Sequence, residues 1–482
     1  MEIREVISDI EVVDITGDSG REIGGIAFDS RSVNPGDLFV AIRGTISDGH
    51  DFIEEAVAGG AVAVVSEEDP KAGPEQVTWI RVAHSRKALA LMASAYFGHP
   101  SRDLHLVGIT GTNGKTTVST LLHRIFTRLG FRAGLISTIQ VLVGEDLYPA
   151  THTTPDPIQV NSFLRKMVDS GCGYCFMEVS SHAIDQNRIE GLDFDGGVFT
   201  NLTREHLDYH QDFKTYLSVK KRFFDTLSSD AFALVNSDDR NAGVMIQNCR
   251  ARKYTFGLRS AEDFRGRINE MHMEGTSMEI NGAEVWVSLP GRFNASNLLS
   301  AYAVAVLLGQ HPDDVLSELS HLAPVRGRFE TIRSEKGIIG IIDYAHTPDA
   351  LSNVLETIRE VNLAGSKIIT VVGAGGNRDR GKRPQMARIA AEASHKVILT
   401  SDNPRNEDPE RILDDLMEGI PGELRDRTLR ITDREEAIRT ACMLAAGGDI
   451  ILVAGKGHET YQVIGDRKIA FDDMKILKQN MN

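Results

Sequence analysis

The sequence predicts an α/β protein built from three domains. The chain has 482 residues, which is too many for one core at about 100–200 residues per domain. Short apolar runs typical of buried strands alternate with helical patterns along its length. A glycine-rich segment, GITGTNGKTT at 108–117, joins one such run to a helical pattern, as in a P-loop-type sheet.

The first domain is expected over residues 1–101. Apolar runs LFVAI at 38–42 and AVAVV at 61–65 predict strands, and a helical pattern covers 51–60 between them. The segment GHPS at 98–101 interrupts both patterns with glycine and proline. We therefore place the first boundary there.

The second domain is expected over residues 102–331. LHLVGIT at 104–110 has the composition of a buried strand, and FMEVSS at 176–181 is a second strand-like run that ends in polar residues. The stretch after Gly114 places apolar side chains on one helical face, namely Val118, Leu121, Leu122, Ile125 and Leu129. The glycine-rich segment thus connects a strand to a helix N-terminus.

This loop departs from the usual phosphate-binding pattern, which has glycine, four residues and then Gly-Lys-Ser/Thr, because isoleucine occupies position 109. Backbone N–H groups at a helix N-terminus and the helix dipole favour phosphate. Lys115 can reach terminal phosphates, and the Thr116 hydroxyl can contact Mg²⁺. We predict an ATP-binding loop formed by Gly111, Thr112, Asn113, Gly114, Lys115, Thr116 and Thr117.

The third domain is expected over residues 332–482 as a Rossmann-like sheet, from the strand-like runs IIGIID, KIITVVG, KVILTSD and DIILVAG. DNPRNE at 402–407 and GKGHE at 455–459 follow two of these runs, at the sheet edge where open α/β folds bind ligands. Arg405 offers a planar fork for a carboxylate, and Glu459 can accept an ammonium group. GAGGNR ends in Arg378 instead of glycine, which argues against NAD.

Composition excludes several classes of protein. A net charge of −15 argues against a nucleic-acid surface. The N-terminus lacks the apolar segment of a signal peptide, and no run of about 18 apolar residues predicts a spanning helix. We expect a cytoplasmic protein with neither nucleic acid nor membrane as partner. Cys172 and Cys175 form a single C-x-x-C, and we expect them to be buried structural residues.

Three further sets of residues remain open on sequence alone. His206 and His210 are spaced to share a metal in a helix, but the Glu of a zinc protease is missing, so a structural role is favoured. Lys220 and Lys221 have the pattern of a solvated helical face. Glu178, at a strand end, is either a structural carboxylate or a Mg²⁺ ligand. The residues indicate an ATP-dependent enzyme and leave its acceptor unnamed.

Seven motifs in this order, TGTNGKTT, EVSSHA, NLTREHLDYH, GRFE, DYAHTPD, DNPR and GKGHE, resemble those of the Mur ligases. The resemblance extends from FDSR at 28–31 to GKGHE and so covers nearly the whole chain. It implies an ATP-dependent ligase that activates the γ-carboxylate of D-glutamate in a UDP-N-acetylmuramoyl dipeptide as an acyl phosphate. An amino acid then attacks it to form an amide in peptidoglycan precursor synthesis.

The resemblance also implies roles for individual residues. Lys115, His206 and Lys220 are the implied catalytic residues, and Lys220 matches, by its spacing from HLDYH, a lysine that the family carbamylates. Thr116 and Glu178 are implied to hold one Mg²⁺, and His206 a second, with carbamylated Lys220 as an anionic oxygen ligand. Further ATP contacts are implied for Asn297, Arg328 and Asp343. Contacts to the UDP-sugar substrate are implied for Ser30, Thr45, Ile46, Ser47, Thr153, Thr154, Ser180, Gln186 and Arg188.

DNPR resembles the form of the motif found in ligases that add meso-2,6-diaminopimelate. Arg405 and Arg378 are then placed to hold carboxylates, and Gly455 and Glu459 to take the distal amino–carboxyl centre. Asp402, Asn403 and Pro404 complete the implied pocket. L-lysine has no second carboxylate and would leave an arginine unpaired, so diaminopimelate is the predicted substrate and L-lysine the alternative.

Other functions are weighed against this prediction. A folylpolyglutamate-type ligase is disfavoured by the Lys-Thr-Thr loop and by DNPR and GKGHE. A nucleotide switch or transport ATPase would hydrolyse ATP regardless of any amino acid, and an idle binding protein would bind ATP without forming product. We expect a monomer whose domains close around the substrates, since donor and acceptor are predicted on different domains.

Overall fold

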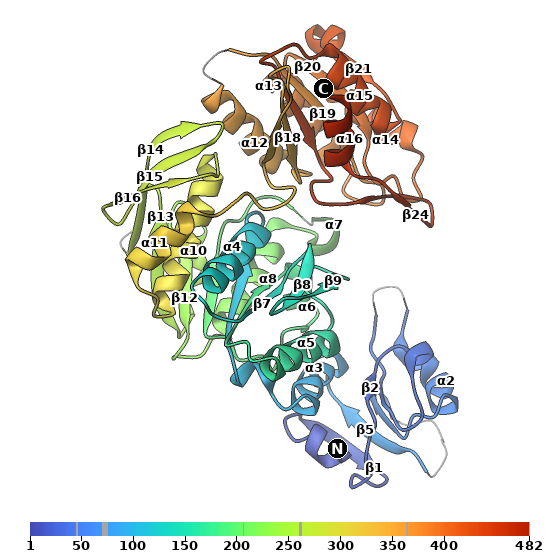
Figure 1. Cartoon of the computed structure of the whole chain (residues 1–482). Helices are drawn as coiled ribbons and strands as arrows, with labels where there is room; N and C mark the ends of the chain where they lie inside the picture. The colour runs from blue at the N-terminus through green and yellow to red at the C-terminus, as the bar shows by residue number, and fades with distance from the viewer. Residues whose placement is uncertain (45–46, 70–75, 206, 260–262, 363–364, 482) are drawn as a thin grey trace.

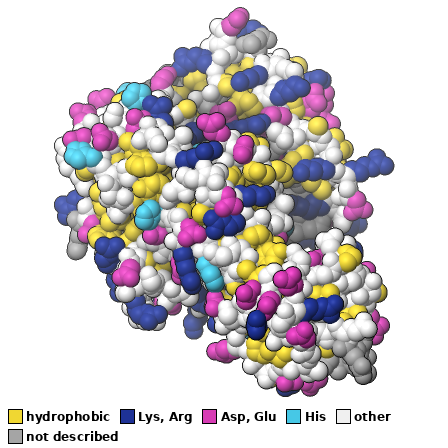
Figure 2. Space-filling model, turned by 60° about the horizontal axis from the view of Figure 1, so that its bottom comes forward, with side chains coloured by type: hydrophobic (Ala, Val, Ile, Leu, Met, Phe, Trp, Pro, Cys, Tyr) yellow, Lys and Arg dark blue, Asp and Glu magenta, His cyan; other side chains and the backbone are white. Residues whose placement is uncertain are grey.

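The computed structural model describes residues 1–482 except 45–46, 70–75, 206, 260–262, 363–364 and 482, and the side chains of 207 and 208. Three sheets follow one another along the molecule, with the N-terminal sheet at one end, the largest sheet in the middle and the C-terminal sheet at the other end (Figure 1). Basic and acidic side chains are interspersed on the face seen in Figure 2. In the described part of the chain, no helix has the length and apolar character needed to cross a membrane.

The N-terminal sheet has the strand order β1-β5-β4-β3-β2, with β1 antiparallel and the others parallel. Its strands are β1 (Val12–Thr16), β2 (Ile26–Ala27), β3 (Leu38–Val40), β4 (Ala63–Ser66) and β5 (Thr78–Val82). Its helices are α1 (Ile3–Val6), α2 (Ile53–Ala58) and α3 (Ser85–Tyr96). The two predicted strands correspond to β3 and β4, and the predicted helix to α2.

The central sheet has 11 strands in the order β16-β15-β14-β13-β12-β11-β6-β10-β7-β8-β9. Parallel pairing runs from β7 to β14, and antiparallel hairpins extend both edges. The strands are β6 (His105–Thr110), β7 (Ala133–Ile136), β8 (Gln140–Val143), β9 (Asp146–Pro149), β10 (Tyr174–Glu178), β11 (Gly196–Phe199), β12 (Phe232–Asn236), β13 (Arg252–Gly257), β14 (Phe264–His272), β15 (Gly275–Ile280) and β16 (Ala283–Val287).

Helices cover both faces of β6, which explains its continuous apolar run. The apolar face of α4 (Lys115–Arg128) packs with α10 (Arg292–Leu307) and α11 (Pro312–Ser320) on one side. On the other side, Leu106 of β6 packs with α5 (Pro157–Asp169), and the neighbouring strands β11 and β12 are covered by α6 (Ser181–Asp185), α8 (Phe213–Asp225) and α9 (Ala242–Met245). The remaining helix of this domain is α7 (Leu207–His210). Strand β6 therefore delivers its C-terminal end to a loop held from both sides.

The C-terminal sheet has the order β17-β18-β22-β19-β20-β21, parallel except for β17. Its strands are β17 (Glu330–Arg333), β18 (Ile339–Asp343), β19 (Ile368–Ala374), β20 (Lys396–Ser401), β21 (Thr428–Arg430) and β22 (Ile450–Ala454), with a separate hairpin of β23 (Tyr461–Ile464) and β24 (Arg467–Ala470). Helices α12 (Pro348–Val361), α13 (Lys382–Ala393), α14 (Pro409–Met417), α15 (Arg434–Leu444) and α16 (Asp473–Asn480) accompany it. The predicted Rossmann-like sheet is confirmed, with the four predicted runs forming β18, β19, β20 and β22.

The domain limits at 101/102 and 331/332 stay predictions. Strand β17 spans the second limit and pairs with β18, so residues on both sides of it belong to the C-terminal sheet. The cysteines lie as expected, since Cys172 and Cys175 are free and buried. Burial raises the pKa of the Cys175 thiol, which keeps it protonated and unreactive.

A fully buried ion pair holds the C-terminal helix to this sheet. Arg434 and Asp473 are 0% exposed and lie 2.7 Å apart, and Arg434 also donates to the carbonyls of Ser401 and Ala454. Removing the carboxylate would leave a buried guanidinium unpaired, at a cost of about 3–5 kcal/mol. We expect Asp473→Ala to lower the thermal unfolding midpoint strongly. Glu435→Ala, which breaks a half-exposed pair with Arg439, should barely change it. Equal midpoints for the two variants would contradict this expectation.

Candidate functional site

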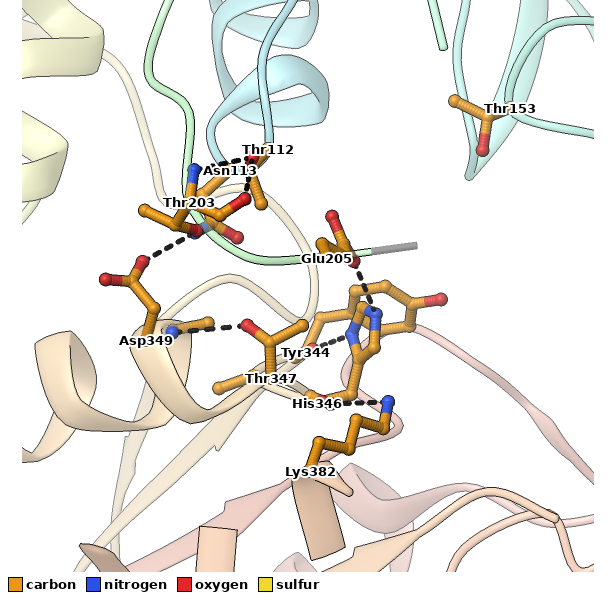
Figure 3. Close-up of polar contacts among 12 residues, drawn as sticks. Thr112, Asn113, Thr153, Thr203, Glu205, Tyr344, His346, Thr347, Asp349 and Lys382 are labelled. Carbon is orange, nitrogen blue, oxygen red and sulfur yellow. Dashed lines mark hydrogen bonds and ion pairs between the residues drawn. The ribbon is translucent and has the colours of Figure 1, made fainter. Parts of the chain in front are cut away.

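A large cleft lies between the central and C-terminal sheets. Its volume is about 1090 Å³, and its walls come from the loop before α4, from α10 and β14, and from the loops that follow the C-terminal strands. Parallel strands of both sheets therefore present their carboxyl ends to the same space, the usual place for ligands in α/β folds. Figure 3 shows how the loop before α4 faces the start of α12 across this space.

The glycine-rich loop has the geometry that phosphate binding requires. Gly111 and Gly114 have φ of 151° and 90°, and a Cβ at Gly111 would lie 1.9 Å from the Thr200 hydroxyl oxygen. Gly114 caps α4, so the first backbone N–H groups of that helix face the loop. Lys115 Nζ donates to the carbonyls of Gly111 and Thr112 at 2.9 Å. Residues 112–117 all line the cleft.

Two side chains with oxygen atoms that could bind a metal line the cleft at this loop, Thr116 and Glu178. Glu178 is fully buried and accepts from Thr138 N at 2.7 Å and from Thr138 Oγ1 at 3.1 Å. Thr116 Oγ1 accepts from Arg328 Nη2 at 3.1 Å. The described residues contain no group of three or more His, Cys, Asp or Glu side chains arranged for a metal. A hydroxyl and a carboxylate fit Mg²⁺, which takes few protein oxygens and completes its shell with phosphate and water.

Lys220 is buried behind the loop, not on a solvated face. It is 1% exposed, and its Nζ donates to Gly111 O at 2.9 Å and lies 4.9 Å from the ring centre of Tyr216. Burial and the nearby Lys115 lower its pKa well below the ordinary lysine value. Lys221 is not on a solvated face either, because its side chain is only 13% exposed and pairs with Asp225. A poorly solvated amine with a lowered pKa is a better nucleophile than an ordinary lysine.

The predictions for His206 and His210 fare differently. His206 lies outside the described residues, as do Thr45 and Ile46, so their predicted roles stay predictions. His210 is buried, and its Nε2 is 2.9 Å from Ser181 Oγ, which agrees with the structural role expected for it.

The segment that links the central and C-terminal domains is anchored by Asp343. Its two oxygens accept from the backbone of Phe329 at 2.7 Å and of Ala345 at 2.8 Å, and burial raises the pKa of its carboxyl group. Arg328 projects from this segment over the ring of Tyr344, with 4.5 Å between guanidinium carbon and ring centre. Asn297 lies against Gly114. Asn297, Arg328 and Asp343 all line the cleft near the loop.

The predicted amino-acid pocket forms the opposite wall of the cleft. Arg378, Asp402, Asn403, Arg405, Gly455 and Glu459 line it, whereas Pro404 does not. Asn403 Nδ2 and the buried Lys456 Nζ both donate to Glu459 Oε2, at 2.9 and 2.8 Å, and no described residue donates to Oε1. Arg405 Nη1 donates to Gly376 O at 2.7 Å. Sequence reasoning did not identify Lys456, although it lies within GKGHE.

A second group of predicted substrate residues surrounds the end of β10. Thr153 lines the cleft, and its Oγ1 lies 3.1 Å from Thr138 Oγ1. Thr154, Ser180, Gln186 and Arg188 form a connected cluster outside the cleft lining. Ser30 and the exposed Ser47 belong to the N-terminal domain, where Ser30 donates to Glu55 at 2.9 Å. The predicted contacts to the UDP-sugar substrate therefore lie in three places: the cleft, the cluster outside its lining and the N-terminal domain.

Contacts between the central and C-terminal domains were not predicted. Asn113 Nδ2 donates to Asp349 Oδ2 at 3.0 Å, and Glu205 lies 3.4 Å from His346 Nε2. Within the C-terminal domain, Lys382 Nζ donates to His346 O at 2.9 Å, and burial lowers the pKa of Lys382 (Figure 3). His346 lies within DYAHTPD, so the motif was a signal for it. Glu205 likewise lies within NLTREHLDYH, whereas Lys382 lies in none of the seven motifs.

Comparisons with known proteins agree with this geometry. Residues 22–97, 109–305 and 327–457 match, in that order, the families described as Mur ligase family, catalytic domain; Mur ligase middle domain; and Mur ligase, glutamate ligase domain. The chain is 53% identical, over 482 residues and the full length of both proteins, to a Bacteroides thetaiotaomicron protein named UDP-N-acetylmuramoyl-L-alanyl-D-glutamate–2,6-diaminopimelate ligase. It is 41% identical to a Geobacillus kaustophilus protein of that name, with 95% of this chain and 94% of the other covered.

Solved structures give the same picture. A structure titled with that ligase name has a TM-score of 0.68 and 31% identity, covering 100% of this chain and 98% of its own. Mycobacterium tuberculosis folylpolyglutamate synthase with ADP has a TM-score of 0.62 and 19% identity, covering 77% of this chain and 91% of its own, which shows a shared fold. Three matching domains and full-length relatives leave one conclusion: this chain belongs to the Mur ligase family.

Proposed function

We propose that the protein catalyses the ATP-dependent addition of meso-2,6-diaminopimelate to UDP-N-acetylmuramoyl-L-alanyl-D-glutamate. One observation carries the proposal: a phosphate-binding loop and a pocket with two arginines face each other across one cleft. A phosphorylated carboxylate formed at the loop would lie within reach of an amine held by the opposite wall. The names of the relatives at 51–53% identity support this substrate pair.

In the first step, an oxygen of the D-glutamate γ-carboxylate attacks the γ-phosphorus of ATP, the bond to ADP breaks, and an acyl phosphate forms. Lys115 moves from the Gly111 and Thr112 carbonyls to the phosphates, and the N–H groups at the start of α4 hold them. The chemistry that Mg²⁺ supplies when held by Thr116 and Glu178 is neutralisation of phosphate charge. Arg328, beside Thr116, adds a cation on the same side.

In the second step, the amine nitrogen of diaminopimelate attacks the acyl carbon. The amide bond forms as the bond to phosphate breaks, and the amine releases a proton. Arg378 and Arg405 hold carboxylates of the amino acid, and Glu459 Oε1 accepts its distal ammonium group. L-lysine would leave one arginine in this pocket without a carboxylate, which favours diaminopimelate.

The buried amine of Lys220 is the proposed carbamylation site. Its nitrogen attacks the carbon of CO₂, forming a carbamate and releasing a proton, and the lowered pKa supports this because only the neutral amine reacts. The carbamate would supply anionic oxygens near a second Mg²⁺, for which His206 is the proposed partner. We further propose that the protein acts as a cytoplasmic monomer.

The direct test is release of ADP in the presence of ATP, Mg²⁺ and the UDP-muramoyl dipeptide, with meso-diaminopimelate or L-lysine added in parallel. Product identity is confirmed by mass spectrometry. Diaminopimelate-dependent release with amide product is the expected result. Lysine-dependent release would reject the proposed amino acid, activity with a pteroyl substrate would indicate a folate-type ligase, and release indifferent to any amino acid would indicate an ATPase.

A further inference from the structure

The two arginines of the amino-acid pocket sit on different loops. Arg378 follows β19 and Arg405 follows β20, and both line the cleft. Both side chains pass close to Gly375, where a Cβ would lie 2.9 Å from Arg405 Nη1 and 3.8 Å from Arg378 Cγ, so the two cations are near enough to repel each other. Without a tie between the loops, this repulsion would push the guanidinium groups apart before an anionic ligand arrives.

Such a tie lies beneath the pocket. Arg383, in the first turn of α13, is 0% exposed, and its Nη2 donates to Gly375 O on the first loop at 3.2 Å. The same Nη2 lies 3.1 and 3.0 Å from the two carboxylate oxygens of Glu407 on the second loop. Nη1 donates to Asp415 at 2.7 Å, which holds the guanidinium in place from α14. Arg383 is thus bonded to both loops at once.

Glu407 completes the connection from the other side. Its carboxylate accepts a hydrogen bond from the backbone N–H of Asn377, and its side chain is 14% exposed. Burial raises its pKa, but the Asn377 N–H and the Arg383 guanidinium outweigh burial, so the pKa lies below the ordinary value. Glu407 is therefore a carboxylate at neutral pH, located two residues after Arg405.

The backbones of the two loops are in close contact above this pair. Gly376 N donates to Asn403 O at 2.9 Å, and a Cβ at Gly376 would lie 1.9 Å from Pro404 O. Asn377 and Arg405 both adopt left-handed backbone conformations, with φ of 53° each. Such conformations carry a cost for residues other than glycine, so surrounding contacts must hold them.

We propose that Glu407 and Arg383 are positioning residues that fix the spacing between Arg378 and Arg405 and thereby select amino acids with a second carboxylate. This inference rests on the proposed function. Neither residue lines the cleft, so both act through the loops that they join. A planar guanidinium binds a carboxylate through two parallel bonds, and that geometry is lost when the donors shift by a fraction of an ångström. An amino acid without the second carboxylate is insensitive to this spacing.

The test compares Glu407→Gln, Glu407→Asp and Glu410→Gln in the full-length enzyme. Glu407→Gln keeps the size of the side chain but removes the charge, whereas Glu407→Asp keeps the charge. Glu410→Gln is the matched control, because Glu410 makes a half-exposed ion pair with Arg430 away from the pocket. Steady-state KM values for ATP, the UDP-muramoyl dipeptide and meso-diaminopimelate are measured, together with kcat/KM for L-lysine and the thermal unfolding midpoint.

In Glu407→Gln we expect KM for diaminopimelate to rise about tenfold, the effect of losing one charge-assisted hydrogen bond, with the other two KM values within about twofold. The ratio of kcat/KM for diaminopimelate to that for lysine should fall, and Glu407→Asp should restore part of it.

An unchanged diaminopimelate KM, or an equal rise in all three KM values, would overturn the inference. A wild-type enzyme without diaminopimelate turnover would instead reject the proposed function. If Glu407→Gln does not fold, Glu407→Asp provides the test. A wild-type KM for diaminopimelate together with wild-type discrimination against lysine supports the inference. Loss of that discrimination at an unchanged KM for diaminopimelate overturns it.

Discussion

Replacing Lys220 by methionine should lower kcat by about 100-fold or more, the scale of losing one preorganised electrostatic group in an active site. Methionine fills much of the buried space next to Tyr216 but cannot form a carbamate. KM for ATP should change little, because Lys220 contacts the loop from behind instead of lining the cleft. Steady-state kinetics with the UDP-muramoyl dipeptide and diaminopimelate measure the effect.

Lys221→Met is the matched control for this experiment. Lys221 is the adjacent residue on α8, and its side chain pairs with Asp225 four residues later, away from the loop. We expect its kcat to stay within about twofold of wild type. A Lys220→Met enzyme as active as this control would show that the buried amine has no part in the reaction.

A carbamate at Lys220 should make the activity depend on both pH and CO₂. Because the pKa of Lys220 is lowered, the neutral amine persists to lower pH than in an ordinary lysine, and it is lost as pH falls through that lowered pKa. Activity should therefore decline on the acid side and respond to bicarbonate after CO₂ removal. Intact mass spectrometry should detect one added CO₂ in wild type and none in Lys220→Met. Activity indifferent to CO₂ would reject the carbamate while leaving a role for the amine.

Replacing Arg405 by alanine should lower kcat/KM for diaminopimelate by roughly 100-fold, because truncating one partner of a buried charge pair costs about 2–5 kcal/mol. The substrate carboxylate would lose the guanidinium group proposed to bind it, and Gly376 O would lose the hydrogen bond that Arg405 Nη1 donates at 2.7 Å. The lysine reaction should suffer less, since lysine brings no second carboxylate. Arg405→Lys should fall between wild type and alanine, because an ammonium keeps the charge without the fork.

Arg388→Ala serves as the control for Arg405. Arg388 lies on α13 of the same domain, and its side chain is 66% exposed and paired with Glu392. Its loss should leave both amino-acid reactions unchanged within error. Equal losses for diaminopimelate and lysine in Arg405→Ala would contradict a carboxylate role and point to general disruption of the loop.

Local signals in the sequence were enough to locate the elements that carry chemistry. The glycine spacing before Lys115 predicted a strand, a tight loop and a helix, because glycine at positive φ and helix-start chemistry act over a few residues. Continuous apolar runs predicted the parallel strands of two sheets, since strands covered on both faces need no polar residues. The motifs DNPR and GKGHE were likewise placed correctly at strand ends.

Tertiary structure alone decided which of these residues meet and which are buried. The helical pattern around Lys220 suggested a solvated face, but α8 packs against the central sheet and buries that lysine behind the loop. Glu205 and His346 come together only because two domains meet across the cleft. Arg383 and Glu407 are bonded only because two parallel strands bring their loops to one edge. Such contacts join residues that are far apart in the sequence. They depend on how whole helices and strands pack, which no local pattern of residues encodes.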